Sequence, residues 1–197
     1  MSNPVAYFGL KPIRHLNGMP WNGQVKRVYF KSTTAGACYI GDIVDINGSS
    51  DTAGEVPDVI LGTVGDNHPI YGVIVGFEPN PDDLTQLYRP TLTERYAWAC
   101  VDPDVIYAIR DDGAAALTAD SVGLNAVLIQ AVAGSTITGL SGMALDTNSD
   151  VPSATATNQL LILNKAPIGG NDLDKNAVWE VLISRHRLRP VAGILGA

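Results

Sequence analysis

The best candidate for a catalytic nucleophile in the sequence is Ser141. In the stretch GLSGM, Gly139 precedes Ser141 at the spacing of a hydrolase nucleophile elbow. Met143 stands where the elbow needs its second glycine, and no strand-turn-helix pattern surrounds the serine. We therefore predict that the chain is not an enzyme, and a small hydrolase that uses Ser141 is the least favoured alternative.

Metal ligands are the second kind of chemistry that the residue types allow. In DLDKNA, Asp172, Asp174 and Asn176 alternate like the start of a calcium loop, but Ala177 stands where the turn glycine belongs. The three histidines lie in separate segments, and none has a cysteine or carboxylate at ligand spacing: His15, His68 and His186. We expect no metal site and no cofactor.

Three arginines alternate near the end of the sequence, in ISRHRLRP. If this stretch is a strand, Arg185, Arg187 and Arg189 share one face. Such a face has two interpretations. It is either a solvated strand that charge protects from edge-to-edge pairing, or a docking surface for an acidic partner, because guanidinium groups bind carboxylates through two parallel hydrogen bonds.

The stretch YFGLKPIRHLNGMPWNG, residues 7–23, has the composition of irregular chain. Pro12 and Pro20 remove backbone donors, and Gly9, Gly18 and Gly23 leave the backbone unfixed. We predict that residues 1–23 form an extended N-terminal arm that holds a partner. Tryptophan and arginine are enriched where binding energy concentrates, and the arm offers apolar and polar contacts of this kind: Phe8, Lys11, Ile13, Arg14, His15 and Trp21.

An alternative for the same segment is that it folds back over its own domain. In that case Trp21 fills the bottom of the core instead of contacting a partner.

The elements that must carry these residues are short strands. The 20 glycines and 12 prolines recur between apolar runs rich in Val, Ile, Tyr and Trp, and helical patterns are scarce. The predicted strands are residues 24–31, 37–46, 70–78, 94–101, 105–111, 123–132, 159–164 and 177–188. We therefore predict an all-β chain, with residues 24–197 forming a single antiparallel β-sandwich or jelly-roll-like barrel.

Composition limits the partners. The net charge of −7 repels phosphate backbones, so nucleic acid is not expected as a partner. No stretch approaches the roughly 20 apolar residues that span a bilayer, and no basic start precedes an apolar run, so we expect synthesis in a cytoplasm and no membrane contact. Both cysteines, Cys38 and Cys100, lie in apolar runs and are expected to be reduced.

Several blocks of the sequence, in order, carry a family resemblance: FGLKPIRHLNGMPWNG, YGVIVGFE, LYRP with RYAWACVDPD, and LTADSVGLNA with AGSTITGLSGMALD. Together they resemble tailed-bacteriophage structural proteins that are encoded near the major capsid protein. The resemblance implies a capsid decoration or cement protein on the outer surface of the virion. It also implies two partners, the major capsid protein and neighbouring copies of the chain, as a homotrimer on local threefold axes. It supplies no catalytic residue.

A head-fibre or host-glycan binding module of the virion is the alternative function in a binding class. Such a module needs exposed aromatic side chains as a platform for sugar rings, and the sequence offers few that are expected to be exposed.

Overall fold

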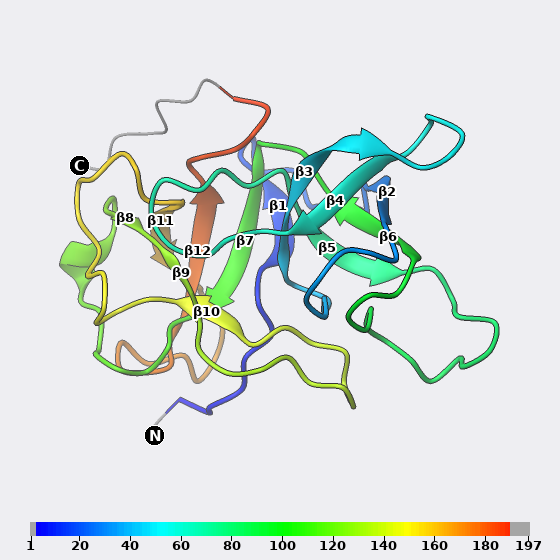
Figure 1. The fold of residues 1–197 in the computed structure, drawn as a ribbon. Coiled ribbons are helices and arrows are strands. Elements are labelled where there is room, and N and C mark those ends of the chain that lie inside the picture. Colours follow the sequence, from blue (N-terminus) through cyan, green and yellow to red (C-terminus); the bar gives the residue numbers. More distant parts are fainter. Residues whose placement is uncertain (1–2, 190–197) are drawn as a thin grey trace.

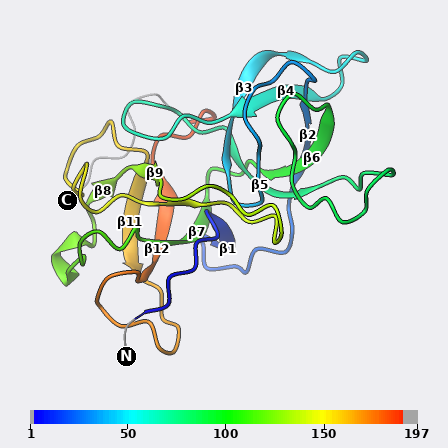
Figure 2. The ribbon, with the colours of Figure 1, turned by 60° about the horizontal axis from the view of Figure 1, so that its bottom comes forward.

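The computed structural model describes residues 3–189, in which the regular secondary structure is almost wholly β-strand and long loops join the strands (Figures 1 and 2). The prediction of an all-β chain is confirmed. The described helical structure is a single short 3-10 turn, η1 (Ala119–Ser121), with Thr118 at its N-cap. No helix within residues 3–189 is long and apolar enough to cross a membrane.

Five strands close into a barrel, at the right of Figure 1, in the order β2-β4-β3-β5-β6. One pair, β2 with β4, is parallel, and the other pairs are antiparallel. Small and β-branched side chains fill the interior, including Val28, Val44 and Ala97, all fully buried. The strands are β2 (Lys26–Phe30), β3 (Ile43–Ser50), β4 (Pro57–Leu61), β5 (Gly72–Phe77) and β6 (Arg95–Cys100).

The other half is an antiparallel sheet, at the left of Figure 1, in the order β1-β7-β12-β11-β8. Its core face alternates large apolar residues such as Tyr107, Ile109 and Trp179, and the hairpin of β9 and β10 also contributes to this core. The strands are β1 (Lys11–His15), β7 (Val105–Arg110), β8 (Asn125–Ala126), β9 (Leu128–Gln130), β10 (Met143–Leu145), β11 (Leu160–Lys165) and β12 (Val178–Ile183).

The barrel is an insertion in the sheet half. All five barrel strands fall between residues 26 and 100, whereas β1 precedes them and the rest of the sheet follows them. The sheet therefore gathers strands from both sides of the barrel in the sequence.

Residues 11–15, which the sequence predicts to lie in an irregular arm, form the edge strand β1 and pair with β7. That expectation is wrong because a proline is compatible with an edge strand. Pro12 sits where the register between β1 and β7 shifts. The neighbouring Leu10 is 1% exposed within the core, so this segment folds back on its own domain as the alternative interpretation holds.

A close crossing of two backbones joins the N-terminal segment to the barrel. Gly9 and Gly41 both have positive φ angles, and a Cβ atom on Gly9 would lie 2.3 Å from the carbonyl oxygen of Gly41. Leu10 N donates to the same oxygen at 2.9 Å. Only glycine allows this approach without a shift of the backbone, and the crossing places Phe8 and Lys11 beside the barrel.

The predicted strand 177–188 ends earlier, at Ile183. Ser184 turns away because its hydroxyl donates to Asn158 O at 2.6 Å, and His186 then pairs with Ile70 in an isolated parallel bridge. The three arginines therefore do not share one face of a strand, and that prediction is wrong.

Candidate functional site

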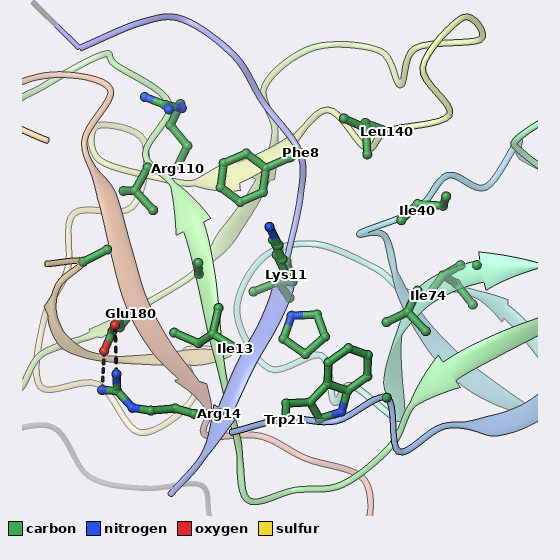
Figure 3. Close-up of a pocket in the computed structure, with 18 of the residues that line it drawn as sticks. Phe8, Lys11, Ile13, Arg14, Trp21, Ile40, Ile74, Arg110, Leu140 and Glu180 are labelled. Atoms are coloured by element: carbon green, nitrogen blue, oxygen red, sulfur yellow. Dashed lines mark hydrogen bonds and ion pairs between the residues drawn. The ribbon is translucent and has the colours of Figure 1, made fainter. Parts of the chain in front are cut away.

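A groove with a volume of about 1,090 Å³ lies between the outer face of the sheet and the wall of the barrel. The outer face of the sheet contributes Ile13, Ala108 and Val178, and the barrel contributes Ile74 and Trp98. Loops complete the walls with Ile40, Leu140 and Ile168. Figure 3 shows several of these side chains around the groove. Most of the lining is apolar.

Five of the six residues predicted as contacts of the N-terminal arm line this groove: Phe8, Lys11, Ile13, Arg14 and Trp21. They gather there because β1 runs along one wall, and because the chain returns past it. In that return, Trp21 N donates to Ile13 O at 3.2 Å and Arg14 pairs with Pro20 in an isolated bridge. The residues form a wall of the folded domain and not a free arm.

The opposite wall includes a tryptophan that the sequence does not single out for binding. Trp98 on β6 lies across from Gly76 of β5, where the register between the two strands shifts. Because glycine has no side chain, the indole of Trp98 is left 37% exposed beside the groove. The sequence predicts the strand that carries Trp98, residues 94–101, but not that this side chain borders a groove.

The charged groups of the groove are mostly fixed by partners. Arg14 forms a two-bond ion pair with Glu180 of β12 (Figure 3). Arg110 donates from Nε to Ala6 O at 2.9 Å and from Nη1 to Asn176 O, and its burial lowers its pKa from the ordinary arginine value. Lys11 is exposed, and its ammonium group makes no hydrogen bond or ion pair with the residues that the structure describes.

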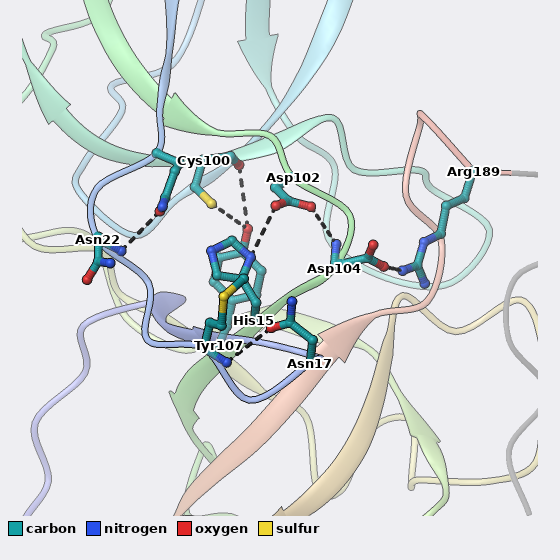
Figure 4. Close-up of polar contacts among 10 residues, drawn as sticks. His15, Asn17, Asn22, Cys100, Asp102, Asp104, Tyr107 and Arg189 are labelled. Carbon is teal, nitrogen blue, oxygen red and sulfur yellow. Dashed lines mark hydrogen bonds and ion pairs between the residues drawn. The ribbon is translucent and has the colours of Figure 1, made fainter.

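His15, the sixth predicted contact, lies outside the groove. Its Nδ1 is 3.2 Å from Asp102 Oδ2, beside a smaller pocket of about 570 Å³ that Asn17 and Gln24 also line (Figure 4).

The three predicted arginine contacts go to three different places. Arg185 is buried and donates to Asn67 Oδ1 at 3.1 Å. Arg187 forms a two-bond pair with Asp45 of the barrel, and Arg189 pairs with Asp104, as Figure 4 shows. These contacts connect the segment after β12 to the rest of the domain. A role of these arginines in binding a partner stays a prediction.

Within residues 3–189, the side chains considered for catalysis and for metal binding do not come together into a site. Ser141 is 1% exposed and accepts a hydrogen bond from Met143 N at 3.0 Å, with no histidine among its recorded contacts in residues 3–189. Within the same residues, no three His, Cys, Asp or Glu side chains are grouped to hold a metal ion. Cys38 and Cys100 are both buried and free.

Comparisons of the chain with protein family models, with curated proteins and with solved structures find no match.

Proposed function

We propose that the protein is a capsid decoration or cement protein, which binds the shell of major capsid protein from outside and stabilises the head. The observation that carries this proposal is the groove, because it gathers five predicted contact residues with Trp98 and Ile168 in one concave apolar surface. Exposed concave apolar surfaces rimmed by polar residues are typical of sites that bind proteins.

The energetics suit a protein that works in many copies. An interface of standard size, on the order of 1,600 Å² in total, is enough for each copy. Occupation of neighbouring sites by copies that also contact one another raises the overall binding strength further. We propose the local threefold axes of the shell as the position of these contacts, with the chain as a homotrimer. The net charge of −7 supports a protein partner over nucleic acid.

A head-fibre or host-glycan binding module is the second candidate. Two indoles, Trp21 and Trp98, line the same groove, and aromatic faces are suited to stack on sugar rings. This is more aromatic surface than the sequence predicts to be exposed. A count of copies per purified virion separates the candidates, because decoration requires hundreds of copies and a fibre requires a handful.

Two isoleucines provide a matched test of the groove. Ile168 is 55% exposed in the groove lining, and Ile137 is 87% exposed outside it. Since both are exposed, aspartate at either position leaves the fold intact. Burying an isoleucine is worth about 2 kcal/mol, so we expect Ile168→Asp to weaken co-sedimentation with phage heads about tenfold or more, and Ile137→Asp to leave it unchanged. Equal binding by both variants, or no binding by the wild type, contradicts the proposal.

A further inference from the structure

The groove carries an excess of positive charge on a protein that is negative as a whole. Its lining includes three cations, Lys11, Arg14 and Arg110, and one carboxylate, Glu180, which gives a net charge of +2 against −7 for the whole chain. Opposite signs on facing surfaces steer association and reject like-charged partners. The groove therefore favours an occupant that brings negative charge.

Only one of these three cations lacks a recorded partner among residues 3–189. Arg14 holds Glu180, so that pair is neutral, and Arg110 is 8% exposed with its donors directed to the carbonyls of Ala6 and Asn176. Lys11 is exposed and lies between Phe8 and Trp21 in Figure 3. It is thus the cation in the groove that is available to an incoming group.

The surroundings of Lys11 define the rest of the occupant. Phe8, Ile13 and Trp21 lie nearby on its own segment (Figure 3), and the half-exposed Trp98 lines the groove from the barrel. A phosphate backbone would have to leave water to enter such walls, which is costly for a charged polymer. A basic segment would place its positive charges beside Lys11 and Arg14, and like charges repel. Apolar side chains on either side of one carboxylate satisfy both the walls and the lysine.

We infer that the groove binds an extended, mainly apolar protein segment whose aspartate or glutamate pairs with Lys11. This inference rests on the proposed function, since it specifies the chemistry of the capsid segment that the groove receives. Aliphatic side chains of the segment pack against Ile13, Ile168 and Trp98 while its carboxylate meets the ammonium group of Lys11. The pair is shielded from water by the bound segment, which makes it stronger than an exposed surface pair.

The test uses overlapping peptides that tile the major capsid protein, with the whole protein as the receptor. We expect the peptides that bind to contain an Asp or Glu flanked by apolar residues. Lys11→Gln should weaken their binding about tenfold, and Lys11→Glu should weaken it more. Lys26 is an exposed lysine of β2 outside the groove, so Lys26→Gln is the matched control and should bind like the wild type.

A charge exchange makes the test specific. A bound peptide with its acidic residue changed to lysine should lose binding to the wild type and recover at least part of it with Lys11→Glu. Equal losses from Lys11→Gln and Lys26→Gln, or a preference for basic peptides, overturn the inference. If heads bind the protein but no peptide does, the inference of a linear acidic segment fails while decoration stands. If peptides bind as expected but heads do not, decoration fails and the groove chemistry stands. If neither binds, both are overturned.

Discussion

Two arginines hold the loops of the barrel, whereas one aspartate holds the loops at the end of the sheet. Arg89 is fully buried and donates to the carbonyls of Thr93, Gly36 and Thr34 at 2.6–2.7 Å, and to Lys31 O at 3.1 Å. Arg95 does the same for a second loop: Nε and Nη2 donate to Glu78 O, Nη2 also donates to Gln86 O, and Nη1 donates to Tyr88 O.

Asp111, at the end of β7, is the counterpart in the sheet. It is fully buried and accepts four hydrogen bonds, from Gly113 N, Asn176 N and Ala177 N at 2.7–3.0 Å and from Trp179 Nε1 at 3.2 Å. Burial is the largest influence on this carboxyl and raises its pKa, although the four donors act in the opposite direction.

The difference follows from which backbone groups a loop leaves without a partner. The long barrel loops turn their carbonyls inward, and a guanidinium group provides five donors in a fixed plane. The loops beside β7 turn N–H groups inward, and a carboxylate provides acceptors only. Arg89 and Arg95 keep their charge at every pH of interest. Of these three loop-binding side chains, only Asp111 can therefore change its protonation state. Three experiments separate the two halves.

The largest effect is expected in the sheet. Asp111→Ala leaves four donors without their acceptor, and two of them, Ala177 N and Trp179 Nε1, are buried. Because each unsatisfied buried donor is costly, we expect a loss of about 4 kcal/mol in the free energy of unfolding. Urea denaturation at neutral pH measures this loss. Asp120, exposed within η1, is the control, and Asp120→Ala should change stability by less than about 0.5 kcal/mol. A loss at Asp111 no larger than at Asp120 would contradict this role of the carboxylate.

In the barrel, Arg89→Met should cost about 3 kcal/mol and make the loops around residues 31–36 and 89–93 sensitive to protease. The loss is smaller than at Asp111 because carbonyls near the surface can accept hydrogen bonds from water once the guanidinium group is gone. Arg89→Lys should recover little, since an ammonium group cannot reproduce the forked geometry. Urea denaturation combined with limited proteolysis measures both effects. Full recovery by lysine would show that charge alone is sufficient.

The smallest effect concerns pH, and it has opposite signs at two buried groups, Asp42 and His186. Burial raises the pKa of Asp42, beside the first residue of β3, to about 6. The folded state therefore holds this proton more tightly than the unfolded state, and stability is gained as pH falls from about 7 to about 4. Burial lowers the pKa of His186, beyond β12, to about 4. The unfolded state takes up this proton first, so stability is lost over the same interval.

The two contributions are of similar size, about 2 kcal/mol each, so they largely cancel in the wild type. Unfolding free energies at pH 7, 5.5 and 4 should show Asp42→Asn losing stability on acidification relative to the wild type, and His186→Gln gaining it. If the two variants change with pH in the same direction, this assignment of the groups is wrong.

The predictable part of the fold is the set of strands with runs of β-branched and aromatic residues. Strands β2, β5, β6, β7, β11 and β12 all lie within predicted ranges or differ from them by one residue. The missed strands have weak local patterns. Pro12 lies within β1, Pro57 begins β4, and β10 is only Met143–Leu145. These strands form because neighbouring strands pair with them, which local residue preferences do not encode.

The candidate site is predictable on one side only. The sequence predicts Phe8, Ile13 and Trp21 as contact residues because they are large apolar side chains in a segment interrupted by prolines and glycines. Two exposed residues that complete the site, Trp98 and Ile168, lie 77 or more positions after Trp21 in the sequence, and only the tertiary fold brings them close. The prediction that the alternating arginines share one face of a strand is wrong for the same reason. Contacts with Asp45, Asn67 and Asp104, which are distant in the sequence, decide where each arginine side chain lies.

The insertion of the barrel between β1 and β7 sets an order for events on the ribosome. Synthesis delivers the barrel strands, residues 26–100, as one continuous block, so the barrel can close while later residues are still being made. Strand β1 is made first but has to wait for β7, at residues 105–110, before it has a partner in the sheet. During that interval, the crossing at Gly9 and Gly41 can already hold the nascent N-terminal segment against the barrel, next to the place where β7 will arrive.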